Sequence, residues 1–341
     1  MTGLDNLAND PCAGAAPLNN ANLRAICLAQ GAPVSSIGTI DQPSAGQTNI
    51  RQGGNPNLDV EKATTWTVGA VFQPDFVPGF SVTADYYNIV IKDAITFPTP
   101  GDVIQQCFGS GNPGLSVNDT CRSINRDPLD GTLNGTAFGL PQPYSNLGRL
   151  STDGIDLTAN YRRDLGFATA NFSLTGNWTN SNKFQATPTS VNRECVGYYS
   201  VNCASIQPEF SASFRSTLSF GKFDISALYR YIDKVRYEPA QNAEDIAAAT
   251  TVTNGVSTID QAGIVNPEFQ KINAEHYVDL TLRAEASDHL TMTVGVQNLF
   301  DNQPKVVGAN VGSTSYNSGN VYPSTYDALG RRYSVSAKLR F

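Results

Sequence analysis

The residues with the greatest chemical potential are six cysteines, which fall into three local pairs along the chain. The pairs are Cys12 with Cys27, Cys107 with Cys121, and Cys195 with Cys203. None forms a Cys-x-x-Cys motif and no histidine lies near them, whereas structural zinc sites use close cysteine spacing or histidine partners. The two cysteines of each pair are 8 to 15 positions apart, in a segment rich in Gly, Pro or Asn. The sequence therefore predicts three loop disulfides, an oxidising compartment and no metal site.

Other residue types with catalytic potential do not combine into a site. The two histidines, His276 and His289, belong to opposite ends of one predicted strand and cannot share a metal. No Gly-x-Ser-x-Gly elbow is present. The glycine-rich run 109–114 lacks the lysine and the helix of a phosphate loop. The Asp/Asn cluster at 125–130 lacks the bidentate glutamate of a calcium loop, and we interpret it as a solvated loop. We therefore predict no enzyme, no catalytic or cofactor-binding residues and no cofactor.

Composition and charge exclude further classes of protein. The 341 residues carry 23 basic and 30 acidic side chains, a formal net charge of −7. An acidic chain without a basic block is unsuited to binding nucleic acid. No apolar run approaches the roughly 18 residues of a transmembrane helix. The first five residues lack the basic and apolar regions of a secretion signal. The length suits either two ordinary domains or one large all-β unit.

A strict period of two dominates the rest of the sequence and predicts β-strands. Nine strands are predicted, at 64–74, 79–93, 151–164, 167–181, 209–220, 223–238, 275–286, 289–299 and 331–341. Short turns at 75–78, 165–166, 221–222 and 287–288 alternate with long polar segments at 1–63, 94–150, 182–208, 239–274 and 300–330. Tight turns at one end and long loops at the other are typical of an antiparallel, up-and-down transmembrane β-barrel.

Aromatic residues divide into two bands along these strands. One band, beside the tight turns, is Phe80, Phe220, Phe223 and Phe341. The other, assigned to the opposite ends, is Tyr86, Tyr161, Trp178 and Tyr231. Two such bands match the aromatic girdles that flank an apolar belt about 25 Å tall. This pattern favours a membrane barrel over a soluble sandwich, in which the apolar face packs on a second sheet.

Several motifs resemble TonB-dependent outer-membrane receptors. Residues 54–61, before the strand that begins at Thr65, resemble the family's Asn-Pro-x-Leu-x-Pro-Glu element, with Val60 in place of the proline. Residues 78–95 look like the strand that follows. Residues 296–301 and 330–333, with the terminal Phe341, are similar to the family's C-terminal signature.

The resemblance implies a place in a larger assembly. Barrels of this family have about 22 strands around a plugged lumen. We expect residues 1–63 to be an extracellular loop and residues 64–341 to be the C-terminal portion of the barrel, with the plug and the first half absent and the fragment inactive alone. The implied location is the outer membrane of a Gram-negative bacterium. The implied partners are outer-membrane lipid, the barrel assembly machinery, and the TonB complex through the missing plug.

The implied activity is active uptake of a metal chelate, a corrinoid, or an oligosaccharide or aromatic compound. Phe341, at the end of an alternating apolar strand, resembles the signal read by the assembly machinery. Loop aromatics could stack on the ligand or pack on neighbouring loops: Tyr144, Tyr198, Tyr199, Tyr316 and Tyr322. Two alternatives stay open. One is a passive porin-like barrel with one further strand hidden in 94–150, and the other is a secreted, disulfide-stapled β-sandwich that binds a ligand.

Overall fold

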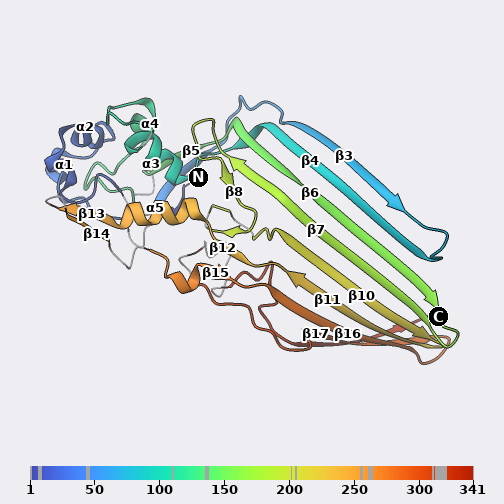
Figure 1. Cartoon of the computed structure of the whole chain (residues 1–341). Coiled ribbons are helices and arrows are strands. Elements are labelled where there is room, and N and C mark those ends of the chain that lie inside the picture. The colour runs from blue at the N-terminus through green and yellow to red at the C-terminus, as the bar shows by residue number, and fades with distance from the viewer. Residues whose placement is uncertain are drawn as a thin grey trace.

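One large antiparallel sheet dominates the computed structural model of the chain (Figure 1). The structure describes residues 2–6, 10–43, 47–109, 111–134, 138–200, 202–203, 206–253, 256–259, 264–308, 311 and 321–340. The strands of the sheet's main path are β3 (Lys62–Phe72), β4 (Phe80–Thr96), β6 (Ser145–Asp164), β7 (Thr169–Gln185), β10 (Phe210–Phe220), β11 (Phe223–Ile232), β16 (Glu275–Glu285), β17 (Leu290–Gln297) and β18 (Arg332–Leu339). They pair in chain order, and β8 (Arg193–Glu194) adds to β7. The predicted nine-stranded, up-and-down antiparallel arrangement is confirmed.

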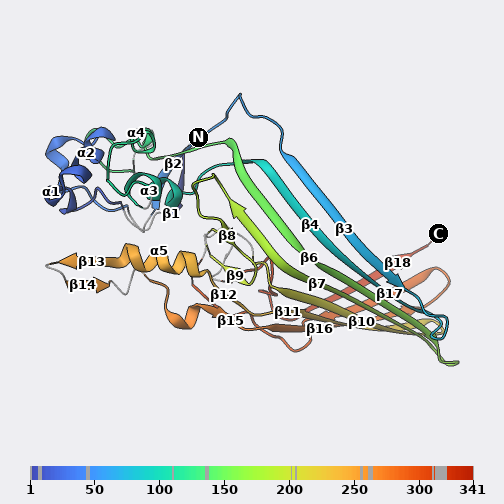
Figure 2. The same ribbon diagram turned by 45° about the horizontal axis from the view of Figure 1, so that its top comes forward.

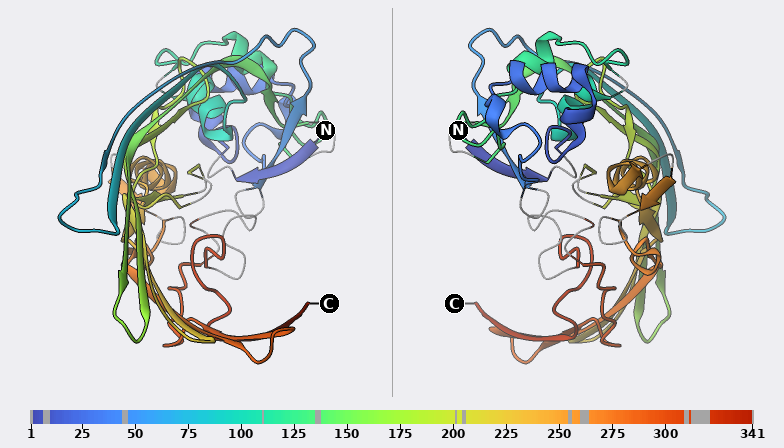
Figure 3. Two further views of the ribbon diagram at one scale, coloured as in Figure 1. Left: turned by 90° about the vertical axis from the view of Figure 1, so that its right-hand side faces the viewer. Right: turned by 90° about the vertical axis from the view of Figure 1, so that its left-hand side faces the viewer.

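The sheet is strongly curved and open. Figure 3 shows it as an arc, with helices and the connection before β18 on its inner side. In the described part of the chain, β3 and β18 each pair along one edge only. The short connections lie at one end of the strands and the long ones at the other, as Figures 1 and 2 show.

Cross-strand register sorts side chains onto two contrasting faces. From Phe80 in β4, the pairing runs through Tyr161 and Phe172, so these residues share a face. The same register continues to the other end of the sheet, where Val294 lies opposite Val335. This convex face is apolar yet exposed, with Val335 71% accessible. The concave face carries Ser, Thr, Asn and charged residues on the alternate positions.

One predicted aromatic position is wrong. Tyr161 was assigned to the long-loop end, but it lies directly opposite Phe80 beside the tight turns. The two rings meet edge to face, and Tyr161 also stacks on Phe172. The reason is strand direction, because β6 runs toward the short turns and its last residues therefore belong to the lower band. Trp66 and Tyr86, in contact with one another, lie further toward the long loops.

The long segments fold into small units. The helices are α1 (Ala16–Asn19), α2 (Ala21–Ala29), α3 (Pro100–Phe108), α4 (Asp119–Ser123) and α5 (Pro239–Ala249), with 3₁₀ turns η1 (Val34–Ser36) and η4 (Pro267–Phe269). The additional strands are β1 (Thr2–Asn6), β2 (Gln47–Gly53), β5 (Leu140–Pro143), β9 (Tyr198–Tyr199), β12 (Val235–Tyr237), β13 (Thr250–Thr253), β14 (Val256–Ile259) and β15 (Lys271–Ile272). The predicted strand 223–238 therefore ends at Ile232, and β12 joins a separate small sheet with β9 and β15.

The tight turn between β3 and β4 generates a test of this fold. Gly79 has φ +84°, and a Cβ there would overlap the carbonyl oxygen of Arg162. Gly166 has a similar φ of +82° but open space around it. We expect Gly166→Ala to cost about 1 kcal/mol through backbone strain alone. Gly79→Ala should cost about 2–4 kcal/mol, because the added methyl group forces two strands apart. Urea unfolding in detergent, followed by circular dichroism, measures both, and equal losses would contradict the predicted close contact.

Candidate ligand-binding region

The concave face and the long-loop layer above it form the region where polar groups gather. An open hollow on this face is lined by Asn160, Arg162, Asn171, Ser173, Arg215 and Thr217, together with Gly79, Tyr161 and Phe172. Alternation places the polar members inward, because their neighbours in each strand point to the apolar side. Amides, hydroxyls and guanidinium groups can hydrogen-bond a polar or anionic solute.

Arg230 of β11 joins this face to the loop layer. Its guanidinium forms a two-point ion pair with Asp279 of β16, at 3.1 and 3.2 Å. It forms a second with Asp327, from the β17–β18 connection, at 2.6 and 3.2 Å. The same guanidinium lies 4.9 Å from the ring centre of Tyr277. One arginine therefore fixes two strands and one long loop together, with the planar geometry suited to paired carboxylates.

The base of that loop is ordered by further contacts. Asn298 is fully buried with φ +51°, a left-handed conformation that asparagine tolerates. Its backbone N–H donates to Asp279, and its side chain exchanges hydrogen bonds with Asn302. The backbone N–H of Asp327 donates to the hydroxyl of Tyr277. Both ends of the connection are thus held to β16, which keeps its described part on the concave side (Figure 3).

The predicted loop aromatics have diverse environments. Tyr199 and Tyr322 are each 1% exposed and pack against one another, in a cluster with Tyr237 and Tyr326. Burial raises the pKa of the Tyr199 and Tyr322 phenols. Such buried rings pack neighbouring loops together and cannot stack on an incoming solute.

The remaining loop aromatics are less buried. Tyr144 packs edge to face on Phe97, and Tyr198 is half-buried. Tyr316 lies outside the described residues. Among the four of these aromatics that the structure describes, Tyr144 and Tyr198 are therefore the ones left partly accessible.

The three predicted cysteine pairs are disulfides in the structure. They join Cys12 to Cys27, Cys107 to Cys121, and Cys195 to Cys203. All three lie in the long-loop layer. Loops of these lengths give about 3 kcal/mol of stabilisation in the chain-entropy account. Phe341, the predicted assembly signal, lies outside the described residues.

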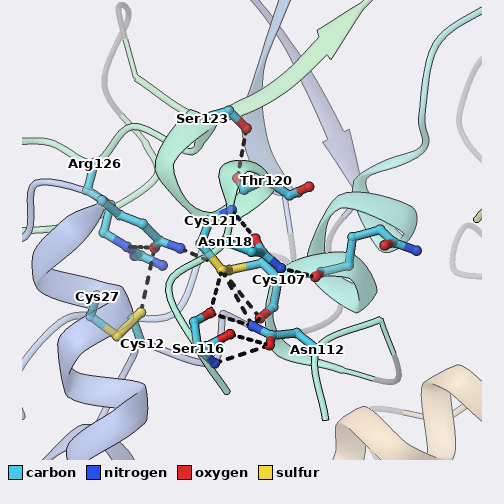
Figure 4. The surroundings of a disulfide bond; sticks show 12 residues. Cys12, Cys27, Cys107, Asn112, Ser116, Asn118, Thr120, Cys121, Ser123 and Arg126 are labelled. Atoms are coloured by element: carbon cyan, nitrogen blue, oxygen red, sulfur yellow. Dashed lines mark hydrogen bonds between the residues drawn. A yellow bond between two sulfur atoms is a disulfide. The ribbon is translucent and has the colours of Figure 1, made fainter. Parts of the chain in front are cut away.

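Between the first two disulfides lies a buried ion pair that sequence reasoning missed. Arg126 and Asp10 are fully buried and form a two-point contact, at 2.6 and 2.7 Å. Gln30 accepts from the Arg126 Nε at 2.6 Å and donates to the sulfur of Cys107. Figure 4 shows Arg126 and both disulfides in one view. The contact links residues 116 positions apart, so it joins the segment before β3 to the β4–β6 connection.

A second missed network lies beneath the third disulfide. Arg193 donates to buried Glu238 at 2.7 Å, and Ser200 donates to the other carboxylate oxygen at 2.5 Å.

Among the described residues, no cluster of three or more His, Cys, Asp or Glu could hold a metal ion. Nor does any helix in the described ranges have the length and apolar character needed to cross a membrane.

Comparison with known proteins provides a family and a shared fold. The family model described as "TonB dependent receptor-like, beta-barrel" matches residues 16–299. No curated protein matches the chain. A variant of the ferric enterobactin receptor of Pseudomonas aeruginosa, in complex with enterobactin, is 15% identical with a TM-score of 0.51, over 92% of this chain and 34% of that chain. The siderophore receptor PirA from Acinetobacter baumannii is 14% identical with a TM-score of 0.49, over 87% and 34%. The chain spans about a third of the length of these structures.

The Arg230 contact generates one prediction. Asp327→Asn removes a carboxylate that accepts two guanidinium hydrogen bonds, so we expect the 321–330 segment to open more easily by about 1.5–3 kcal/mol. Hydrogen–deuterium exchange of that segment should then be at least tenfold faster. The control is Asp288→Asn, because Asp288 is 92% exposed and lies 3.9 Å from Lys222. Unchanged exchange in the Asp327 variant would contradict the anchoring role.

The buried ion pair of Arg126 with Asp10 generates a second prediction. Asp10→Asn leaves the Arg126 charge buried without a carboxylate, which costs about 3–5 kcal/mol. Faster exchange across α2 and residues 124–133, with the disulfides intact, is the expected observation. Asp119→Asn is the matched control, since its pair with Arg122 is exposed and is worth about 1 kcal/mol or less. If the two variants behaved alike, the buried pair would not be holding the two segments together.

Proposed function

The chain belongs to the TonB-dependent receptor family, and from this premise we propose that it forms wall strands of an outer-membrane barrel that takes up a large, scarce nutrient. The observation that carries the proposal is the exposed apolar convex face. Leu280, Val294 and Val335 are 39%, 43% and 71% exposed on that face. In water such a continuous apolar surface is unfavourable, and in a bilayer it is the surface that lipid requires. A soluble sandwich would instead pack this face against a second sheet.

The direction of the barrel follows from its connections. Short turns belong to the periplasmic side and long loops to the outside in barrels of this kind. We therefore propose that residues 1–63 lie on the extracellular side and that residues 64–341 provide the wall. The disulfides of the loop layer support a location outside the cytosol, where disulfides form and persist.

The cargo is proposed to enter through the loop layer and meet the polar concave face. A metal chelate, a corrinoid, or an oligosaccharide or aromatic compound carries enough polar groups to hydrogen-bond with the amides, hydroxyls and arginines of that face. Energy would come from the TonB complex, acting through a plug domain on the concave side. Barrel insertion would use the assembly machinery, with Phe341 as its signal. These roles are those of a transporter rather than an enzyme.

Membrane insertion tests the proposal. Leu280 lies on the convex face between the two aromatic bands, opposite Ala227 and Val296. An arginine at the middle of the lipid belt costs about 2–4 kcal/mol. We expect Leu280→Arg to lower the fraction of chain that resists urea extraction from phosphatidylcholine vesicles. Thr281→Arg, the next residue on the concave face, should leave that fraction nearly unchanged. Equal effects, or no vesicle association by the unaltered chain, would contradict the proposal.

A further inference from the structure

Three cations lie in one cross-strand row on the convex face, at its long-loop end. Lys62 of β3 is directly opposite Lys92 of β4, and Lys92 is directly opposite Arg149 of β6. Register continuity from Phe80 to Lys92 places the row on the same face as the apolar belt. Lys183 of β7, opposite Ser151, adds a fourth cation to that face. Like charges directly opposite one another destabilise a sheet, so the row carries a cost that the fold itself does not explain.

Only part of this charge is balanced within the described residues. Lys62 forms an ion pair with Asp93 at 2.8 Å. Asp93 is the extra residue of a β-bulge in β4. Lys92, Arg149 and Lys183 form no ion pair in the described part of the chain, and all three are exposed. Glu194 of β8 lies directly opposite Lys183. The positive charge with no carboxylate directly opposite is therefore centred on Lys92 and Arg149, with Lys183 at its edge.

The height of the row matches a membrane surface. Lys92 is twelve residues along β4 from Phe80, which marks the lower aromatic band. At about 3.3 Å per residue and a tilt near 40°, this separation is about 30 Å along the barrel axis. The apolar belt of such barrels is about 25 Å tall, so the row lies just beyond it, at the level of lipid headgroups. Trp66, opposite Asn88, and Tyr86 lie below the row, in the upper half of the belt.

We propose that Lys92, Arg149 and Lys183 bind the phosphate group of an anionic lipid in the leaflet that faces the long loops. Arg149 can donate two parallel hydrogen bonds to phosphate, and the flanking lysines add point charges. Below the row, the pairs Val90–Ser151 and Asn88–Asp153 precede the apolar surface, which begins at Tyr86 and Ile155. The lipid's acyl chains would extend past these pairs onto that surface, which favours a lipid over a free anion. Filling the site would relieve the repulsion between Lys92 and Arg149. The inference rests on the proposed membrane orientation of the barrel.

The test is lipid affinity of the full chain, folded in maltoside detergent and titrated with diphosphoryl lipid A. We expect the double variant Lys92→Gln with Arg149→Gln to bind about 30-fold more weakly, since each cation near an anionic surface contributes about 1 kcal/mol. The exchange variant Lys92→Arg with Arg149→Lys preserves charge and should stay within about threefold of the unaltered chain. Circular dichroism reports whether the glutamine variant folds. If it folds poorly, the exchange variant still tests the site, because it keeps both charges.

The matched control is Arg332→Gln with Lys338→Gln, which removes one Arg and one Lys from the concave face of β18. Its affinity should be unchanged. An equal loss in both glutamine variants would show attraction by net charge alone and overturn the proposal. Equal binding of lipid A and phosphatidylcholine would do the same, as would full displacement by 10 mM inorganic phosphate, which would show a site for free anions. Any of these outcomes would overturn the lipid site alone. The proposed membrane insertion of the barrel would still stand, because the vesicle assay with Leu280→Arg tests it separately.

Discussion

Continuous register across the main sheet is the constraint on which the other features depend. Alternation within one strand defines two faces only for that strand, and hydrogen bonding to its neighbours extends the same two faces across β3 to β18. A slip of one residue in any ladder would move apolar side chains to the concave side and arginines into the lipid belt. The exposed convex surface, the polar concave wall and the cationic row are therefore three consequences of one pairing pattern.

The loop layer is stabilised by a different set of interactions. Its segments lack the long ladders of the sheet, and their apolar clusters are small. Disulfides and buried charged networks, Arg126 with Asp10 and Arg193 with Glu238, provide the fixed contacts instead. Buried pairs of this kind add little net stability relative to apolar packing, but losing one partner is costly. They define which segments lie side by side, which a receptor surface requires if it is to present a reproducible shape to a ligand.

Arg230 connects these two parts. It lies on the concave face, is held by Asp279 within the sheet, and reaches Asp327 in the loop layer. The β17–β18 connection is consequently held inward, over the wall that an entering solute would meet. A change in this contact would alter the space on the concave side without disturbing the sheet, because β11 and β16 remain paired by their backbones.

Local patterns in the sequence were sufficient for the strands, the tight turns, the up-and-down order and the three cysteine pairs. Alternation and turn residues act over a few positions, and the cysteines of each pair are at most 15 residues apart. The tertiary structure alone decided the contacts of Asp327 with Arg230 and of Asp10 with Arg126, because these join residues about 100 positions apart with no repeating pattern. It also aligned Lys92 with Arg149, because the register between β4 and β6, which are separated by a long connection, is not encoded by composition within a single strand. The place of Tyr161 in the lower band, in contrast, already follows from the predicted strand 151–164 and the turn at 165–166.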